Sequence, residues 1–215
     1  MVKNRYFTEG LIETKFEPGS GKRVLKNLLG IKSKRVLDQQ EAEAFLKTEQ
    51  WSVRYFSRNH RFTENDIRKI HQVFLSKIYE WAGNYRNVNL QKDSFPFAPA
   101  RQIPRLMKEF SRDILTQYTP CLFKETEKVI EAISIVHTEL LLIHPYREGN
   151  GRTTRLLADL MALQADLPPL DFSFIKGQAK DEYYRAVQSG LSKNYEPIKK
   201  IIRIALQRGL RLVDK

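Results

Sequence analysis

Apolar residues recur at spacings of three and four along most of the chain, the pattern of helices that bury one face. This pattern predicts helices over residues 37–56, 64–82, 104–118, 125–143, 152–165, 180–191 and 196–213. The 125–143 segment is apolar around most of its circumference, so we expect it to lie at the centre of the fold together with 152–165. Residues 1–37 lack this periodicity and carry several glycines. They are expected to form an irregular lead-in to a domain over 38–215.

Capping residues mark several of the predicted helix ends. Asp38 and Thr63 precede periodic segments, and their side-chain oxygens can accept hydrogen bonds from the free N–H groups of a first turn. Gly83 is expected to end the second helix, since glycine readily adopts the left-handed conformation that closes a helix. Pro168-Pro169 is expected to end the helix over 152–165.

One segment departs from helical spacing. Residues 85–90 alternate weakly between apolar and polar positions, and Phe95-Pro96-Phe97 follows a polar turn at Lys92-Asp93-Ser94. Extended segments on both sides of a polar turn predict a short β-hairpin. The sequence therefore predicts a mainly α fold, a helical bundle around two central helices with one small hairpin.

The composition is that of a folded domain. Hydrophobic residues make up 41% of the 215 residues and charged residues 29%, so the chain can bury a core and is neither disordered nor fibrous. The single Cys121 excludes an intramolecular disulfide and a cysteine metal site. No apolar run approaches the roughly 18 residues that span a bilayer, and no signal peptide is visible in residues 1–10. We therefore expect a soluble, cytoplasmic protein without a membrane partner.

The formal net charge of +12 is concentrated at the two ends of the chain. Residues 1–35 carry nine Lys or Arg and three Glu, and residues 193–215 carry seven Lys or Arg and two acidic residues. The residues between them are nearly neutral, with 21 basic and 20 acidic side chains. This distribution weakens the nucleic-acid-binding interpretation that the net charge alone suggests. It favours a solvated surface, with an acidic docking partner as the alternative.

The most informative segment is HPYREGNGRTTR, residues 144–155, between the two central helices. Its Gly149-Asn150-Gly151 stretch tolerates positive φ, which allows successive backbone N–H groups to converge on an anion. The segment leads directly into a helix, whose free N–H groups and dipole also attract negative charge. Arg152 and Arg155 lie on one face of the first turn, so two guanidinium groups can bind a polyphosphate beside the loop.

Two further side chains of this segment carry reactive groups. Glu148 offers a carboxylate, and Mg²⁺ typically takes one or two carboxylates while phosphate oxygens and water complete its shell. His144 carries an imidazole, which titrates close to neutral pH and can accept a proton. His71 and His137 lack such a context and are expected to be structural. A base, a metal ligand, an anion-binding loop and two arginines together predict phosphate-transfer chemistry.

This segment resembles the signature of Fic-domain proteins, H-x-F-x-[DE]-G-N-G-R-x-x-R, and differs from it only at Tyr146, where the family usually has Phe. We expect the Tyr146 ring to anchor the loop in the core, with a hydrogen-bond partner for its hydroxyl group. YEWAGNYRNVNL at 79–90 and FPFAP at 95–99 resemble the helix end and the flap hairpin of the family, and DEYYRAV at 181–187 resembles its tyrosine-bearing helix. The resemblance covers about residues 40–205 and implies the Fic fold.

The resemblance implies a protein adenylyltransferase, which transfers AMP from ATP to a Tyr, Ser or Thr hydroxyl of a target protein. His144 would take the proton from that hydroxyl, and Glu148 would hold Mg²⁺ on the phosphates. Arg152 would bind the departing phosphates, and Arg155 would bind the γ-phosphate. The anion hole would consist of Gly149, Asn150 and Gly151.

The resemblance also implies roles outside the loop. The flap would cover the nucleotide and pair with the target backbone as an added strand. It consists of Asn89, Leu90, Gln91 and Lys92. Tyr183 and Tyr184 would approach the adenine and the ribose, although adjacent helical residues face different ways and one of the two can pack inward. The family often has Asn seven residues after the second tyrosine, where this chain has Leu191.

Resemblance to stand-alone bacterial Fic toxins suggests a toxin of a toxin–antitoxin pair, acting in the cytoplasm of the producing bacterium on a target such as the topoisomerase gyrase. A delivered effector with the same chemistry, acting in a host cell, is one alternative. Transfer of another phosphate-containing group is a second alternative. A non-enzymatic nucleic-acid-binding module is the interpretation that the complete motif and the near-neutral middle of the chain favour least.

Control of the activity is the last expectation from the resemblance. In this family an inhibitory helix carries [ST]-x-x-x-E-[GN], and its Glu pairs with the second motif arginine, here Arg155. This chain contains only near matches, SKIYEW at 76–81 and SKNYEP at 192–197. We therefore expect that the chain lacks its own inhibitory helix and that a separate small antitoxin protein inhibits it.

Overall fold

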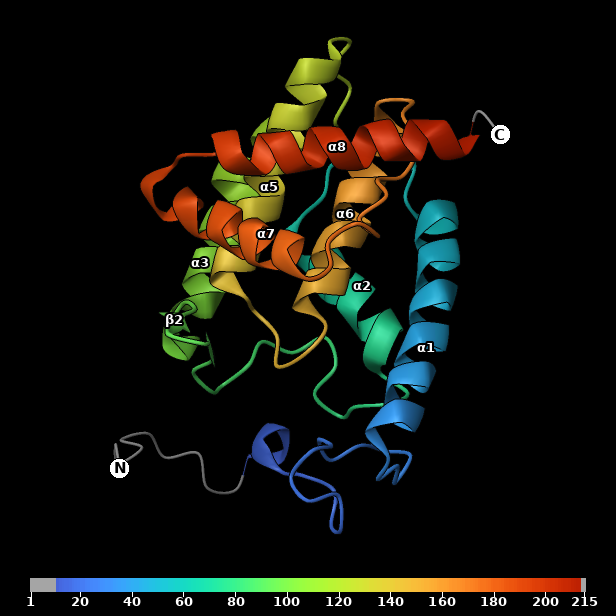
Figure 1. Ribbon diagram of the computed structural model, residues 1–215, viewed down its shortest axis with the longest axis vertical. Helices are drawn as coiled ribbons and strands as arrows, with labels where there is room; N and C mark the ends of the chain where they lie inside the picture. The colour runs from blue at the N-terminus through green and yellow to red at the C-terminus, as the bar shows by residue number, and fades with distance from the viewer. Residues whose placement is uncertain (1–10, 214–215) are drawn as a thin grey trace.

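The computed structural model describes residues 11–213 (Figure 1). Residues 1–10, where no signal peptide is expected, and residues 214–215 lie outside the described part. The helices and strands are α1 (Lys34–Tyr55), α2 (Glu64–Leu75), β1 (Gln91–Lys92), β2 (Phe95–Pro96), α3 (Ile103–Glu109), α4 (Thr116–Tyr118), α5 (Thr126–Ile143), α6 (Asn150–Gln164), α7 (Gln178–Gln188) and α8 (Glu196–Val213). Short 3₁₀ or π turns are η1 (Ile12–Thr14), η2 (Ala100–Gln102), η3 (Phe110–Leu115) and η4 (Ser189–Ser192). Within residues 11–213, no helix has the length and apolar character needed to cross a membrane.

Helices α5 and α6 form the centre of the fold, as the sequence predicts. Helix α5 packs against α6, α7 and α8, and α6 also contacts α1 and α2. In Figure 1, α8 crosses in front of α5 and lies at the upper end of α6, while α1 lies on one side of the central pair and α3 on the other. Leu157 and Met161 of α6 are fully buried, and removing such a side chain from water contributes roughly 1.5–3 kcal/mol. The loop between α5 and α6 is therefore carried by the most rigid part of the molecule.

The mainly helical fold is confirmed, but α1 starts earlier than predicted. It begins at Lys34, with Ser33 as its N-cap. Asp38 is not a cap, because it lies inside the helix and forms an ion pair with Lys34 one turn earlier. The cap at Thr63 is confirmed: its hydroxyl oxygen accepts the Asp66 N–H at 3.3 Å, and Asp66 Oδ2 accepts the Thr63 N–H at 2.8 Å.

Helix α2 ends at Leu75, well before the end at 82 that the periodicity predicts. Residues 76–83 instead form turns, because long-range contacts hold them. Tyr79 donates its hydroxyl hydrogen to Glu41 of α1 at 2.6 Å, and Ile78 O accepts a backbone hydrogen bond from the lead-in at 2.8 Å. These partners are more than thirty residues away, so the local apolar pattern does not reveal them.

The predicted hairpin is present but short. Strands β1 and β2 are antiparallel, with Gln91 opposite Pro96 and Lys92 opposite Phe95. The turn between them contains Asp93 with φ 54°. Residues 85–90 are not a strand, contrary to the prediction. In this segment Arg86 is buried instead, and its backbone N–H bonds to Pro145 O at 2.9 Å, beside the central loop.

The described part of the lead-in, residues 11–33, is irregular apart from η1 and packs onto the loop between α5 and α6 at the lower end of Figure 1. Glu13 is buried, and its carboxylate accepts the Asn87 N–H at 2.8 Å. Its carbonyl oxygen accepts the Arg147 Nε–H at 2.9 Å. The lead-in therefore supports the loop directly, and a domain boundary after residue 37 stays a prediction.

Candidate active site

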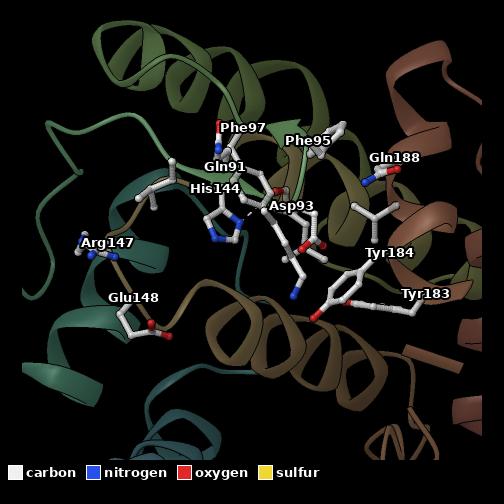
Figure 2. Close-up of a pocket in the computed structure, with 14 residues that line it drawn as sticks. Gln91, Asp93, Phe95, Phe97, His144, Arg147, Glu148, Tyr183, Tyr184 and Gln188 are labelled. Atoms are coloured by element: carbon white, nitrogen blue, oxygen red, sulfur yellow. Dashed lines mark hydrogen bonds between the residues drawn. The ribbon is translucent and has the colours of Figure 1, made fainter. Parts of the chain in front are cut away.

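The loop between α5 and α6, residues 144–149, separates two cavities. The flap-side cavity has a volume of about 320 Å³ and lies between the hairpin, the loop and α7 (Figure 2). The α1-side cavity has a volume of about 480 Å³ and lies between the loop, α1, the start of α6 and the lead-in. Arg147 and Glu148 line both cavities, so this loop is the boundary between them.

His144 follows the last residue of α5 and adopts the left-handed conformation, with φ 52°. Its N–H donates to Leu140 O at 3.0 Å, which closes the helix. The chain then leaves the helix axis, and the imidazole lines the flap-side cavity beneath the hairpin (Figure 2). The Phe97 ring stacks on the imidazole with 3.7 Å between centroids. A left-handed residue other than glycine is uncommon, and such residues are concentrated at functional sites.

The hydrogen bonding of His144 defines which nitrogen can act as a base. Its Nδ1 lies 3.3 Å from Leu141 O, and because a carbonyl oxygen only accepts, Nδ1 carries the proton. The lone pair is then on Nε2. Burial, opposed by the hydrogen bond to Leu141 O and helped by the charges of Arg86 and Lys92, lowers the pKa of His144 to about 4. The imidazole is therefore neutral near pH 7 and able to accept a proton.

His71 of α2 holds the loop through its backbone. Its Nδ1 accepts the Gly83 N–H at 2.8 Å, so its Nε2 carries the proton and donates it to Glu148 O at 3.0 Å. Its ring stacks on Tyr146 with 3.7 Å between centroids. Burial lowers the pKa of His71 to about 4, which keeps this hydrogen-bond pattern intact near neutral pH. His71 is thus structural, as expected, and the structure it maintains is that of the site.

Tyr146 and Asn150 stabilise the conformation of the loop by hydrogen bonds to each other. Asn150 Oδ1 accepts the Tyr146 N–H and its Nδ2 donates to Tyr146 O, both at 2.8 Å. The Tyr146 ring is buried, as expected for an anchor, but its hydroxyl group has no hydrogen-bond partner among residues 11–213, contrary to expectation. These bonds hold the Asn150 side chain against Tyr146, and its backbone N–H can contribute to an anion hole.

Gly149 brings the loop to the start of α6 with φ 84°. A Cβ atom there would lie 3.0 Å from Leu75 Cδ1, so both the conformation and the space require glycine. The first helical bond of α6 is that of the Thr153 N–H to Gly149 O at 3.0 Å. The preceding N–H groups have no helical acceptor and can bind an anion. They belong to Asn150, Gly151 and Arg152.

Glu148 presents a half-exposed carboxylate between the two cavities. Its Oε1 accepts the Gly149 N–H at 3.0 Å and lies 3.7 Å from Arg152 Nη2. No group of three or more His, Cys, Asp or Glu side chains able to hold a metal ion occurs within the described residues. A lone carboxylate fits Mg²⁺, which completes its shell with phosphate oxygens and water, and does not fit a metal held by protein ligands alone.

Arg152 is held by a residue that the sequence analysis did not single out. Its Nη2 lies 2.5 Å from Glu41 Oε2, and its guanidinium lies 4.7 Å from the centroid of the Phe74 ring. Glu41 is buried on α1 and also accepts the Tyr79 hydroxyl hydrogen at 2.6 Å. Nothing around Glu41 in the sequence distinguishes it from the other acidic residues of α1. The other N–H donors of Arg152 remain available, and the residue lines the α1-side cavity.

Arg155 also lines the α1-side cavity, but its guanidinium has no hydrogen-bond or ion-pair partner within residues 11–213. The two near matches to the inhibitory motif do not reach it. Residues 76–81 form the turns after α2, and Glu196 pairs with Lys199 at 2.8 Å. Arg155 is therefore free for an anionic ligand.

The flap residues divide into two groups. Leu90, Gln91 and Lys92 line the flap-side cavity. Asn89 does not line it, because its Oδ1 accepts the Ala100 N–H at 2.8 Å and supports the exit of the hairpin. Within the described residues the sheet has only strands β1 and β2, so one edge of β1 is unpaired.

Tyr183 and Tyr184 both line the flap-side cavity but in different ways. Tyr183 is buried, and its hydroxyl lies 2.6 Å from His137 Nε2. Tyr184 is half-buried and lies across the cavity from the loop between α5 and α6 in Figure 2, with the Lys92 ammonium 3.8 Å from its ring centroid. Tyr184 is thus the more accessible of the two. Leu191 is exposed outside the cavity, whereas Gln188 lines it.

Arg86 and Phe97 are two more residues of the site that the sequence reasoning missed. Arg86 donates to His144 O at 2.7 Å, and Phe97 covers the imidazole. Both lie in segments that carry the family resemblance, so that resemblance was the available signal. Arg86 lies outside the contiguous 144–155 segment, and Phe97 has no acid, base, metal-binding or anion-binding group.

Comparison with known proteins identifies the relatives of this chain. Residues 61–162 match the model of the Fic/DOC family. Protein adenylyltransferase VbhT from Bartonella schoenbuchensis is 32% identical over 151 residues, which are 68% of this chain and 30% of the relative. Protein adenylyltransferase Fic from Nematostella vectensis is 27% identical over 209 residues, which are 96% of this chain and 43% of the relative. The chain thus spans less than half the length of these relatives.

Solved structures share the fold. The N-terminal Fic domain of a putative cell filamentation protein from Bartonella quintana, solved with bound ADP, is 26% identical with a TM-score of 0.70, covering 89% of this chain and 94% of that one. BepC from Bartonella tribocorum, solved with bound AMPPNP, is 23% identical with a TM-score of 0.71, covering 91% and 97%. Since the matched residues 61–162 include α2, the hairpin and the complete loop, the chain belongs to the Fic/DOC family.

Proposed function

We propose that this chain is a protein adenylyltransferase, which transfers AMP from ATP to a hydroxyl group of a target protein and releases diphosphate. The observation that carries the proposal is the position of His144, whose neutral imidazole lines a cavity next to the free N–H groups of α6. The relatives named protein adenylyltransferase support the same activity.

The reaction needs a base beside an electrophilic phosphorus atom. Nε2 of His144 accepts the proton of the target hydroxyl, and the oxygen forms a bond to the α-phosphorus of ATP. The bond from that phosphorus to the bridging oxygen breaks on the opposite side, and diphosphate leaves. The N–H groups at the start of α6 stabilise the charge on the α-phosphate oxygens, because they are oriented before the substrate binds.

The phosphate chain then extends toward the α1-side cavity. Arg155, which is unpaired, binds the terminal phosphate, and Arg152 binds the departing phosphates with the donors that Glu41 leaves free. Glu148 holds Mg²⁺, an ion that neutralises charge on the phosphates when it is bound. The chain's own groups in this cavity therefore act on the leaving group rather than on the attacking hydroxyl.

The flap-side cavity receives the nucleoside and the target. Tyr184 offers an aromatic face to the base or the ribose, and Gln188 offers an amide in place of the Asn that the family often has near Leu191. The unpaired edge of β1 pairs with an extended segment of the target, which brings one hydroxyl toward His144. Such pairing uses the backbone, so other surfaces select the target.

The biological setting is also a proposal. A toxin inhibited by a separate antitoxin is supported by Arg155, which pairs with no carboxylate of the described residues. A delivered effector is supported by structural relatives such as BepC, a VirB-translocated Bartonella effector protein. A topoisomerase such as gyrase stays a prediction for the target. Labelling of lysates with tagged ATP, followed by identification of the labelled protein, tests it.

The position of the label in ATP tests the reaction. Purified chain with Mg²⁺ and a lysate is expected to transfer label from α-³²P-ATP to protein, to transfer none from γ-³²P-ATP, and to stop when EDTA removes the metal. Label from γ-³²P-ATP alone would show phosphate transfer instead. Absence of transfer, together with salt-sensitive retention on DNA that survives loss of His144, would favour the nucleic-acid-binding alternative.

A further inference from the structure

Arg86 places a guanidinium group in the interior beside the catalytic loop. The residue is 2% exposed, and it forms no ion pair with any carboxylate of the described residues. Burial lowers the pKa of Arg86 to about 10, which still leaves it charged at neutral pH. A buried charge without an ion-pair partner is costly, so the groups that satisfy it indicate its role.

All hydrogen-bond acceptors of the Arg86 side chain are main-chain carbonyl oxygens. They are His144 O at 2.7 Å from Nε, Val88 O at 2.5 Å from Nη1, and Ala98 O at 2.6 Å and Ile143 O at 3.4 Å from Nη2. These oxygens belong to three separate segments: the end of α5, the entry to the hairpin and the exit from it. One rigid group therefore joins the flap to the helix that carries the proposed base.

The end of α5 depends on this contact for two reasons. The last carbonyl groups of a helix lack helical donors and form the negative end of its dipole, so a buried cation there is stabilised. His144 leaves the helix in the left-handed conformation, and Arg86 binds the carbonyl oxygens of His144 and of the residue before it. The guanidinium thus fixes the backbone from which the imidazole projects.

The hairpin depends on the same group. Val88 and Ala98 flank the flap, and Phe97, next to Ala98, stacks on the His144 imidazole with 3.7 Å between centroids. The Ala98 N–H reaches Leu142 O of α5 at a longer 3.4 Å. A lysine ammonium could not replace Arg86, because it is a point charge and cannot span acceptors on three segments.

We propose that Arg86 is a positioning residue of the transfer reaction, which holds the flap and the catalytic imidazole in register. This inference rests on the proposed adenylyltransferase activity. Arg86 lines neither cavity, so it acts through His144 and the hairpin and not by contact with the nucleotide.

The test compares R86K with a matched control, R58K. Arg58 also donates its Nε–H to a carbonyl at a helix end, Gln164 O of α6 at 3.1 Å, but it lines neither cavity beside the loop. For AMP transfer we expect R86K to lower kcat about 100-fold, because small displacements of reacting groups cost that much, while KM for ATP stays within about 3-fold. R58K is expected to change neither constant. Unchanged kcat in R86K, or a raised KM with unchanged kcat, would overturn the proposal.

Amide hydrogen exchange of the same full-length variants provides a readout that needs no activity. The N–H groups of Phe97 and Ala98 are expected to exchange faster in R86K than in R58K and the parent chain, whereas α8 exchanges equally in all three. Unchanged exchange at the flap would contradict the proposal. Faster exchange throughout R86K, including α8, would also contradict the proposal. Arg86 would then stabilise the whole fold and not the flap in particular. If the parent chain transfers no AMP, the proposed function fails while this comparison still decides the role of Arg86.

Discussion

The two cavities beside the loop between α5 and α6 differ in chemistry. Half of the residues that line the flap-side cavity are apolar or aromatic, and its central group is the neutral imidazole of His144. The α1-side cavity is lined by five basic and three acidic residues. The loop therefore separates a surface suited to a nucleoside and a polypeptide from one suited to phosphates. In the proposed reaction the bond that breaks would lie at this boundary, next to the free N–H groups at the N-terminus of α6.

The largest expected effect is the loss of the base on the flap side. His144→Ala should lower the rate of AMP transfer by about 10²–10⁴-fold, because proton transfer in the transition state contributes that much. ATP binding, measured by calorimetry, should persist, because the proposed phosphate-binding groups lie on the other side of the loop. His60→Ala is the control, because His60 pairs with Asp66 at 3.1 Å and lines neither cavity. Equal loss of activity in both variants would show that His144 has no specific role in the chemical step.

Two glycine substitutions distinguish the role of the loop conformation in stability from the role of the free N–H groups in anion binding. Gly149→Ala should destabilise the fold by about 1–3 kcal/mol in urea unfolding, because φ is 84° and the new Cβ would meet Leu75 Cδ1 at 3.0 Å. Gly151→Ala should leave stability unchanged or slightly raised, because the residue is helical and its nearest neighbour would be Arg155 Nη2 at 4.0 Å. It should nevertheless weaken ATP binding, since a methyl group would occupy the approach to the free N–H groups. Unchanged ATP affinity in Gly151→Ala would show that the phosphates do not bind at the free N–H groups of α6.

On the α1 side, Arg155→Ala should weaken ATP binding about 10-fold or more, the effect of losing a charge-assisted hydrogen bond. AMP should bind the variant as it binds the parent chain, because AMP has no terminal phosphates to reach this cavity. Titration of both nucleotides by calorimetry measures the difference. If AMP lost affinity as much as ATP does, the terminal phosphates would not be the part of the nucleotide that binds in the α1-side cavity.

Glu41→Gln should have a smaller effect on the same side. The amide keeps a hydrogen bond to Arg152 but loses the charge that orients it, so we expect KM for ATP to rise about 3-fold with little change in kcat. Tyr79→Phe, which removes the other partner of Glu41 and leaves the ion pair, should change KM less. Faster transfer by Glu41→Gln would show instead that this carboxylate competes with phosphate for Arg152.

The smallest effect on activity is expected at Asp159 of α6, where stability rather than catalysis should respond to pH. Burial raises the pKa of Asp159 to about 7, above the value of 3.8 for the exposed group. The folded state therefore holds the proton more tightly, and this residue makes stability fall as pH rises from about 4 to 7. Asp159→Asn, which keeps an oxygen for the Leu170 N–H, should raise stability by about 2 kcal/mol at pH 8 and by much less at pH 5. An equal gain at both pH values would contradict the raised pKa.

The segments that the sequence predicted well are those whose pattern is local. The periodicity of α5 and α6 and the cap at Thr63 each depend on residues within one or two turns, and the structure has them as predicted. The predicted start of α1 and the predicted end of α2 were wrong. The end of α2 depends on packing against distant segments, such as the contact of Tyr79 with Glu41.

The same distinction applies to the site. The candidate chemistry of the 144–155 segment is visible in the sequence because the base, the acid, the glycines and the arginines are contiguous. The supporting residues His71 and Glu41 come from other helices, and their roles follow from side chains that meet only after folding. Of the two tyrosines, only packing decided that Tyr183 turns inward to His137.

The sequence by itself thus determined the helical class, the central pair of helices and the reactive loop, because periodicity and a contiguous motif are properties of neighbouring residues. The tertiary structure alone decided that Arg152 is paired, that Arg155 has no ion-pair partner among residues 11–213, and that Arg86 joins the flap to His144. The physical reason is that an isolated sequence position carries charge and hydrogen-bonding capacity but no partner. Partners for buried polar groups are set by the packing of distant segments, where each unsatisfied donor or charge would be costly.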